Sequence, residues 1–434
     1  MKRTINSLAT MQRLCTVFVV CLMSTMAWGQ RLSAIDQLKA DPRKAYGTDY
    51  PYQVVDYKMT PAPKGYVPFY LSHYGRHGSR YYWNATLYRE VDTLLTRAHR
   101  SHQLTPAGEA FYEKYKACSE ELRDGVSELS EVGWQQHQAI ARKMYSAYPE
   151  IFKQGGNVLA ISSLQGRCVI SMAAFCQAMA QCNPKIIIRE QSSRFTLDGV
   201  VPTDGQNPVK HNYARNVKPR YEQNRDKLKI PETLRDKIIE RMFTNTEGLP
   251  GTLHHISSNM INLYTSLPSI GHEGMMEGII TDEEIAAEWE RDNLGTYSWV
   301  FGPQWQTVPV LQDIIRKADA KLDGSNDRIA DLRFGHDTVL GPLTVLMGLN
   351  GADIDPEDPF EVKNCYQNWE TCKASNLQLI FYRSKKQGDD ILVKCLLNGE
   401  EATLPVPTNS FPYYKYSDFR QFYTARCNNA PTAQ

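Results

Sequence analysis

Short runs of apolar, β-branched and aromatic residues alternate along this chain with longer stretches that show helical spacing. Strand-like runs occupy residues 67–71, 157–162, 185–188, 329–334, 377–382 and 391–397. Between them, residues 130–145 and 169–179 carry apolar side chains at the spacing of a helix face. A repeated order of strand and helix is typical of α/β proteins. We therefore expect an α/β fold with a central, mostly parallel sheet flanked by helices.

Residues 190–300 differ in composition from the rest of the chain. They are polar and rich in Asn, Arg and Glu, with helical stretches expected near 231–243, 253–266 and 282–291. We interpret this region as a mostly helical cap inserted into the α/β core. The chain has 434 residues, which exceeds the usual length of one domain. The expected organisation is a first core segment (30–189), the cap (190–300) and a second core segment (301–434).

The first 29 residues are typical of a secretory signal peptide. Lys2 and Arg3 precede an apolar stretch at 14–23, and Ala27 and Gly29 supply small residues for cleavage. This stretch is too short to cross a bilayer, because a spanning helix needs roughly 17–25 apolar residues. We expect export to the periplasm or the medium, with no membrane span after cleavage.

Charge and cysteine content narrow the possible partners. The 49 Lys and Arg residues nearly balance 48 Asp and Glu, so there is no general attraction to nucleic acid. Eight of the ten cysteines follow residue 29, and an even number in an exported chain permits disulfides. Cys365 and Cys372 are near enough to close a small loop, and Cys395 and Cys427 fall in separate C-terminal elements; the pairing stays open. The irregular cysteine spacing does not match a zinc site.

The segment after the first strand-like run places a histidine between two arginines. Arg76, His77, Gly78 and Arg80 follow the run at 67–71 closely. Guanidinium groups match the oxygens of a phosphoryl group in shape and charge. The imidazole of His77 can attack phosphorus, and Gly78 lacks a Cβ where a phosphate would approach the backbone. This segment predicts a site for phosphoryl transfer.

Two later segments carry side chains of matching chemistry. Arg167 lies where a strand gives way to a helix, and His336 and Asp337 follow the run at 329–334. Asp337 also fits the start of a helix. Open α/β sheets bind ligands outside the carboxyl ends of their strands. We therefore expect these three residues to share one pocket with His77.

The expected chemistry in that pocket is hydrolysis of a phosphomonoester. His77 would displace the alcohol and form a phosphohistidine, and Asp337 would protonate the leaving oxygen and later activate water. Three guanidinium groups neutralise the charge and no carboxylate-rich metal cluster is evident, so we expect no metal and no cofactor. The predicted catalytic residues are His77 and Asp337, and the predicted phosphate ligands are Arg76, Arg80, Arg167 and His336.

At these residues the sequence resembles the histidine acid phosphatases, the family that contains phytases, and most of all the multiple inositol polyphosphate phosphatases. The likeness covers roughly residues 43–427. Residues 125–137 resemble the family's Gly-x-Leu-Thr-x-x-Gly-x-x-Gln-His helix start, and residues 391–400 and 411–419 resemble the inositol polyphosphate subgroup. The resemblance implies the same roles for the six residues named above.

Two positions depart from the family pattern. Tyr82 stands where the family usually has Pro, two residues after Arg80. His336 and Asp337 stand where the inositol polyphosphate subgroup typically has His-Ala-Glu. The His-Asp form of this chain is that of bacterial phytases and other acid phosphatases, so positional preference on an inositol ring is open.

The substrate is expected to be a small phosphorylated anion, with inositol polyphosphates such as phytate first. The stretch 205–229 holds seven Lys or Arg residues against Glu222 and Asp226, which could bind non-reacting phosphates or form a solvated face. Residues 81–83 are aromatic and could line the entrance or pack inside. A broad acid phosphatase for sugar phosphates or nucleotides is the close alternative. A phosphoglycerate-mutase-like transferase and a binding protein without catalysis are more distant ones.

Overall fold

The computed structural model describes residues 32–206, 222–386 and 388–430, which form one eight-stranded sheet with helices around it. The strand order is β3-β2-β4-β1-β5-β6-β7, and β8 pairs with β6. The strands are β1 (Tyr66–Arg76), β2 (Gly156–Ser162), β3 (Ile186–Gln191), β4 (Ala330–Gly335), β5 (Asn376–Ser384), β6 (Leu392–Leu397), β7 (Glu400–Glu401) and β8 (Tyr413–Lys415).

The predicted α/β fold is confirmed, and its sheet is mixed. Strands β3, β2, β4 and β1 run parallel to one another, whereas β5 pairs antiparallel with β1 and β6, and β6 pairs antiparallel with β7 and β8. The loop between β5 and β6 is short, and strands joined by a short loop must turn back on each other. The parallel strands are instead joined through helices. All six strand-like runs of the sequence form strands.

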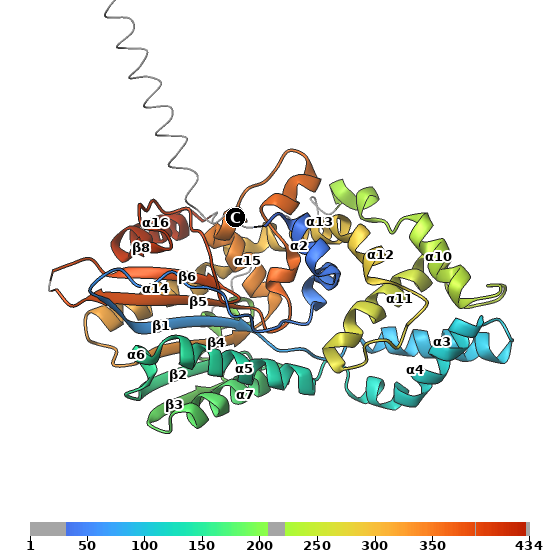
Figure 1. Ribbon diagram of the computed structural model, residues 1–434, viewed down its shortest axis with the longest axis horizontal. Helices are drawn as coiled ribbons and strands as arrows, with labels where there is room; N and C mark the ends of the chain where they lie inside the picture. Colours follow the sequence, from blue (N-terminus) through green and yellow to red (C-terminus); the bar gives the residue numbers. More distant parts are fainter. Residues whose placement is uncertain (1–31, 207–221, 387, 431–434) are drawn as a thin grey trace, which may run out of the picture.

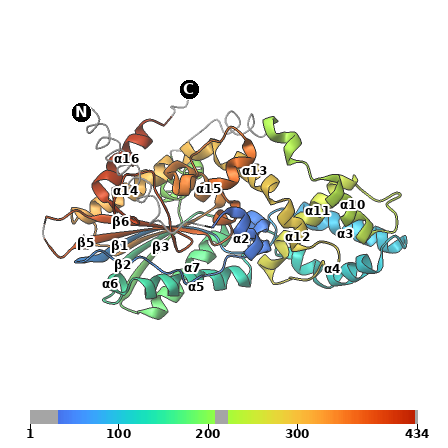
Figure 2. The same cartoon turned by 45° about the horizontal axis from the view of Figure 1, so that its top comes forward.

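Helices cover both faces of the sheet (Figures 1 and 2). One face packs against α5 (Glu131–Ala147), α6 (Pro149–Phe152) and α7 (Gly166–Cys182), and the other against α14 (Val308–Leu322), α15 (Asp337–Met347) and α16 (Tyr416–Asn428). Successive side chains of a strand point to opposite faces. In β1, Tyr70 accordingly belongs to the α14 side and Leu71 to the α5 side. This double cover explains the continuous apolar runs in the sequence.

A group of helices lies at one end of the sheet (Figures 1 and 2). It contains α3 (Ala85–Arg100), α4 (Pro106–Asp124), α10 (Glu232–Met242), α11 (Leu253–Ser266) and α12 (Asp282–Ala287). Their apolar side chains form one core with those of α2 (Ala34–Ala40) and the 3-10 segment η1 (Pro42–Asp49). Helix α13 (Trp289–Val300) follows α12 directly. Part of this helical region thus comes from residues 85–124, ahead of the stretch expected to form a cap.

The eight cysteines after residue 29 are free thiols in the structure. Cys365 Sγ contacts the backbone oxygens of Ile354 and Val362, and Cys372 Sγ lies 3.2 Å from Ser375 Oγ. The disulfides that the sequence permitted are therefore not supported.

The expected signal peptide lies outside the described residues. Among the helices that are described, none has the length and apolar character needed to span a membrane.

Candidate active site

The parallel register brings three strand ends together. In the order β2-β4-β1, Arg76 pairs with Gly335, and Ser162 pairs with Phe334. The backbone amide of His77 donates to the carbonyl of Gly335 at 2.9 Å. The segments that carry His77, Arg167 and His336 therefore leave the sheet side by side, as the sequence predicted.

The imidazole of His77 is buried and oriented by its own loop. Its Nδ1 lies 2.9 Å from the carbonyl oxygen of Gly78. Because a carbonyl only accepts hydrogen bonds, Nδ1 carries the proton and Nε2 keeps a lone pair. Burial lowers the pKa of His77 well below its usual value, and the positive charges of Arg76 and Arg80 lower it further. His77 is thus neutral, which suits a nucleophile.

The loop after His77 is held by the start of α5. A Cβ on Gly78 would lie 2.5 Å from the carbonyl oxygen of Gly133, and the Gly78 amide donates to Ser171 Oγ at 3.0 Å. The Ser79 amide donates to Gln136 Oε1 at 2.9 Å. Close packing on α5, rather than the approach of a phosphate, therefore explains the glycine at position 78.

Arg76 and Asp337 form an ion pair at the mouth of the site. Arg76 is buried, and its Nη2 lies 2.9 Å from Asp337 Oδ2. Its Nη1 donates to the carbonyls of Thr48 and Thr371. Burial acts to raise the pKa of Asp337, but the Arg76 and Arg80 guanidinium groups outweigh it, so the pKa lies below its usual value. Asp337 is the first residue of helix α15, and His336, not the aspartate, occupies the N-cap position that the sequence suggested for Asp337.

His336 lies beside His77 and contacts polar groups from α7 and the preceding loop. The two ring centroids are 5.6 Å apart. His336 Nε2 lies 2.9 Å from Ser163 Oγ, and Cys168 Sγ lies 3.6 Å from the same nitrogen. Burial lowers the pKa of His336 to about 4, and the nearby Arg167 adds to this effect. The ring is therefore uncharged near neutral pH.

Each of the three predicted arginine ligands keeps a buried nitrogen without a partner. The Nε atoms of Arg76, Arg80 and Arg167 make no hydrogen bond in the structure. Arg167 is held from one side, since its Nη1 donates to Ser127 Oγ at 3.0 Å. Buried N–H groups are rarely left unsatisfied. Three such groups close to one neutral histidine suit a multivalent anion.

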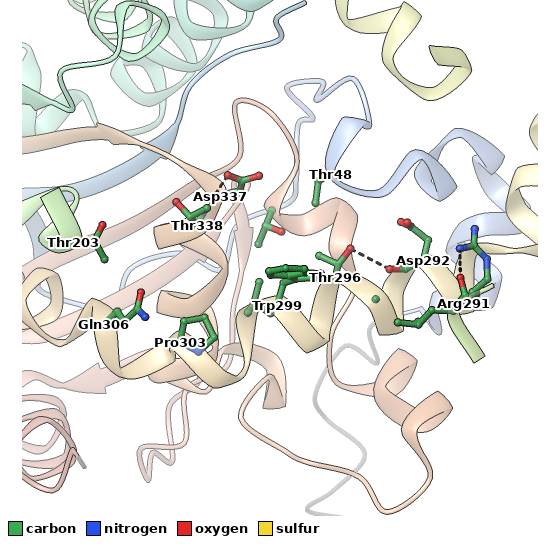
Figure 3. A pocket seen from close by; sticks show the side chains of 14 residues that line it. Thr48, Thr203, Arg291, Asp292, Thr296, Trp299, Pro303, Gln306, Asp337 and Thr338 are labelled. Atoms are coloured by element: carbon green, nitrogen blue, oxygen red, sulfur yellow. Dashed lines mark hydrogen bonds between the residues drawn. The ribbon is translucent and has the colours of Figure 1, made fainter. Parts of the chain in front are cut away.

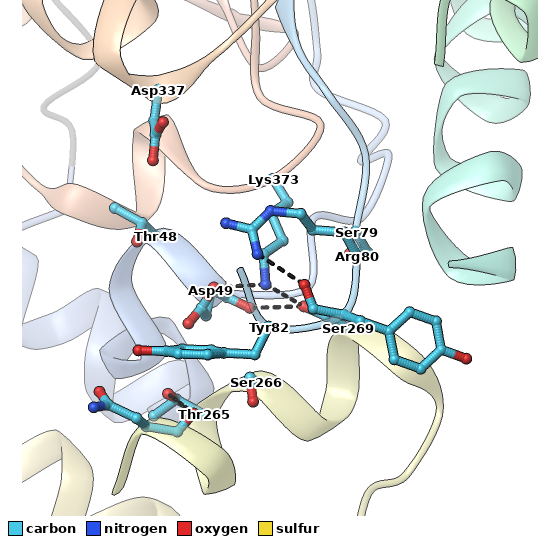
Figure 4. A network of polar contacts seen from close by, with 12 residues as sticks. Thr48, Asp49, Ser79, Arg80, Tyr82, Thr265, Ser266, Ser269, Asp337 and Lys373 are labelled. Atoms are coloured by element: carbon cyan, nitrogen blue, oxygen red, sulfur yellow. Dashed lines mark hydrogen bonds and ion pairs between the residues drawn. The ribbon is translucent and has the colours of Figure 1, made fainter. Parts of the chain in front are cut away.

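A buried ion pair lies under Arg80. Lys373 Nζ lies 2.6 Å from Asp49 Oδ1 and 3.0 Å from Ser269 Oγ (Figure 4). Burial lowers the pKa of Lys373 to about 8, against the effect of Asp49. Ser130 Oγ, at the start of α5, contacts the carbonyls of both Ser79 and Ser269. This network ties η1 and the helical region to the loop that carries His77.

Two cavities meet at Asp337. The first, which we call the charged cavity, has a volume of about 260 Å³ and is lined by residues that include Arg76, Arg80, Tyr82 and Trp83. The second, the Trp299 cavity, measures about 640 Å³ (Figure 3). Leu234 and Ile261, from α10 and α11, also line the charged cavity. The site therefore lies between the strand ends and the helical region.

Several residues of this site have no signal in the sequence. Thr48, Asp49 and Lys373 belong to no motif and come from η1 and the loop before β5. Of the seven basic residues in 205–229, Lys210, Arg215, Lys218 and Arg220 lie outside the described residues, and Arg225, Lys227 and Lys229 line neither cavity. Tyr82 and Trp83 do line the charged cavity, whereas the Tyr81 hydroxyl donates to Glu121 at 2.7 Å.

In the described residues, no group of three or more His, Cys, Asp or Glu side chains is arranged to hold a metal.

Solved structures of the same fold come from known phosphatases. The Bifidobacterium longum multiple inositol polyphosphate phosphatase, in complex with phosphate, superposes with a TM-score of 0.69 at 18% identity, over 88% of this chain and 98% of that one. The phytase from D. castellii superposes with a TM-score of 0.63 at 15% identity, over 90% of this chain and 86% of that one. The Hafnia alvei phytase in complex with myo-inositol hexakis sulphate superposes with a TM-score of 0.52 at 12% identity, over 84% of this chain and 99% of that one. This chain has the fold of these phosphatases.

The resemblance to histidine acid phosphatases is thus confirmed at the level of the fold. No protein-family model matches the chain, and no curated protein matches it in sequence. The shared fold spans nearly all of the Bifidobacterium phosphatase, and it includes both the sheet and the helical region. What the chain does at its site must therefore be argued from its own side chains.

Proposed function

We propose that this protein is a phosphomonoester hydrolase that acts on inositol phosphates through a phosphohistidine at His77. The observation that carries the proposal is the neutral, buried His77, which lies close to the charges of Arg76 and Arg80, with Arg167 close to the neighbouring His336. Each of these three guanidinium groups keeps an unsatisfied N–H. A nucleophile without charge beside a built anion site is what attack on a phosphate monoester requires.

The first half of the reaction transfers the phosphoryl group to the protein. The lone pair of His77 Nε2 forms a bond to phosphorus as the bond from phosphorus to the alcohol oxygen breaks. Arg76, Arg80, Arg167 and His336 bind the other phosphate oxygens. Asp337 gives its proton to the departing oxygen, so the alcohol leaves uncharged.

Water completes the reaction. The Asp337 carboxylate accepts a proton from water, whose oxygen attacks phosphorus and breaks the bond to His77 Nε2. Inorganic phosphate leaves and His77 returns to its neutral form. Asp337 then holds the proton that the next cycle needs.

Substrate binding supplies the acid form of Asp337. In the free site, Arg76 and Arg80 hold the pKa of Asp337 low. A bound phosphate neutralises those guanidinium groups and adds negative charge nearby, which raises the pKa of Asp337. We expect activity on the acid side of neutrality, since Asp337 must be protonated in the complex.

The substrate class rests on the fold and on the anion site together. The structural neighbours are phytases and a multiple inositol polyphosphate phosphatase, and two of the complexes contain inositol hexasulfate or its equivalent. We assign the chain the same class of substrate.

We also propose that residues 1–29 direct its export, which N-terminal sequencing of the secreted or periplasmic protein tests.

The proposed function is tested by the His77→Ala variant. Phosphate release from inositol hexakisphosphate, an inositol monophosphate and an aryl phosphate should fall by at least about 10³-fold. Wild-type protein quenched during turnover of ³²P-labelled substrate should carry acid-labile, base-stable label, and His77→Ala should carry none. The matched control is His254→Ala, an exposed position outside both cavities. Full activity of His77→Ala would rule out this mechanism.

A further inference from the structure

The two cavities that meet at Asp337 differ in chemistry. Five residues line both of them: Thr48, Arg291, Asp292, Thr296 and Asp337. The charged cavity adds Arg76 and Arg80, together with Asp49 and Glu288. Among the described residues, the only charged side chains that line the Trp299 cavity are the three that also line the charged cavity, Arg291, Asp292 and Asp337. Two of the proposed ligands of the phosphoryl group, Arg76 and Arg80, therefore lie on one side of Asp337.

The position of Asp337 fixes what lies on each side. In the reaction proposed above, Asp337 protonates the oxygen that joins phosphorus to the rest of the substrate. That oxygen must lie at the boundary between the phosphoryl group and the leaving alcohol. Since Arg76 and Arg80 place the phosphoryl group in the charged cavity, the leaving alcohol extends into the Trp299 cavity.

The walls of the Trp299 cavity suit an uncharged ring. Trp299 is 47% exposed, and the apolar side chains of Leu228, Val300 and Pro303 lie in the same lining. Thr203, Gln306 and Thr338 supply polar groups around them (Figure 3). The C–H face of a saturated six-membered ring packs on an indole, and its hydroxyls bond to threonine and glutamine. The volume of about 640 Å³ accommodates such a ring.

Charge works against a heavily phosphorylated leaving group in this cavity. Its single described cation, Arg291, donates through Nη1 to the carbonyl of Leu228 at 3.1 Å and lies 3.8 Å from Glu288. Asp292 and Asp337 contribute carboxyl groups to the same walls. A phosphate is best held by several unopposed cations or N–H groups. The described lining offers one cation, Arg291, whose Nε makes no hydrogen bond but lies 3.8 Å from a carboxylate oxygen of Glu288.

We propose that the Trp299 cavity is the leaving-group subsite, and that it selects a polyhydroxylated six-membered ring bearing few phosphates. The proposal rests on the phosphatase function above. It assigns Trp299 as the residue that recognises the ring, and it ranks an inositol monophosphate above inositol hexakisphosphate in kcat/KM.

The first test compares three ligands in wild type and Trp299→Ala. The ligands are an inositol monophosphate, ethyl phosphate, which lacks a ring, and inorganic phosphate as a competitive inhibitor. Trp299→Ala should raise KM for the inositol monophosphate about tenfold. It should leave the KM of ethyl phosphate and the Ki of phosphate within about twofold. Trp299→Phe should restore most of the loss, and Phe195→Ala, which removes an aromatic ring that is 81% exposed, is the matched control.

The second test adds a cation to the subsite. Thr203→Lys should shift the ratio of kcat/KM for hexakisphosphate over monophosphate upward by about three- to tenfold. An equal effect of Trp299→Ala on all three ligands, no effect on the inositol monophosphate, or a wild-type preference for the hexakisphosphate would overturn the proposal. Absence of hydrolysis of every phosphomonoester by wild type would instead reject the phosphatase function itself.

Discussion

Acid should destabilise this protein strongly, because two histidines behind the loop that carries His77 are buried in their uncharged form. His73 lies within β1 and His137 within α5, and both are 1% exposed. His73 contacts the rings of Phe175 and Phe334, and His137 contacts Phe334. Burial lowers the pKa of each to about 3.

The size of the effect follows from these pKa values. In the unfolded chain a histidine titrates near 6.5, so below that pH the unfolded state binds protons that the native state does not. Stability contributed by each ring is complete above pH 6.5 and is lost as the pH falls toward 3. At pH 4.5 each ring has lost roughly 2–3 kcal/mol of unfolding free energy, and the pair about 5 kcal/mol. A typical native state has only about 5–15 kcal/mol in total.

Urea titrations at pH 7.0 and 4.5 measure this loss. The comparison of interest is the difference between the two pH values for each variant, because that difference removes any change in packing. In His137→Leu, the drop in unfolding free energy between the two pH values should be smaller than in wild type by roughly 2–3 kcal/mol. His73→Leu should behave alike. The exposed His254→Gln should keep the full drop.

An identical drop in wild type and His137→Leu would refute the reasoning, since His137 would then take up no proton on unfolding. Such a result would mean that the ring is already solvated in the native state. It would also remove the link between this cluster and acid sensitivity. A confirmed effect means that the acid side of the activity profile is limited by unfolding as well as by catalysis.

Two further predictions concern the site. Asp337→Asn should lower kcat for an inositol phosphate by about 10²–10⁴-fold but for an aryl phosphate far less, because an aryl oxide leaves without a proton; equal losses in steady-state assays would show that Asp337 is not the proton donor. Arg167→Ala removes a charge-assisted contact and should raise the Ki of phosphate by about 10- to 100-fold. Ser127→Ala, which removes only the hydroxyl that holds Arg167, should raise it less, and unchanged phosphate inhibition in Arg167→Ala would remove that residue from the anion site.

The sequence predicted the sheet well because its strands are buried on both faces. Runs such as 157–162 and 377–382 are apolar without alternation, and all became strands. The helices α3 and α4 were harder to place, since nothing local in residues 85–124 says which core they join. They pack on α10 and α11, more than a hundred residues later. The antiparallel half of the sheet likewise depends on the route of the chain and not on strand composition.

The candidate site, like the fold, contains residues that the sequence predicts and residues that it does not. Six residues could be named from the sequence because they lie where strands end and helices begin: Arg76 at the end of β1, His77 and Arg80 in the loop after it, Arg167 in the first turn of α7, and His336 and Asp337 between β4 and α15. The parallel order β2-β4-β1 then brings them together. Asp49 and Lys373 could not be named, because an ion pair between η1 and the loop before β5 leaves no local pattern.

The substrate side of the site depends most on tertiary structure. Chemistry at phosphorus uses residues that the sheet edge places, so short motifs predict it. The proposed selection of the alcohol uses Thr48, Trp299 and Thr203, from η1, α13 and the segment after β3, which meet only in the folded chain. Substitutions on these segments can change the preferred leaving group while His77 and its arginines stay in place. In the proposed function, the motif around His77 therefore predicts the reaction, and the Trp299 cavity selects the phosphate ester that undergoes it.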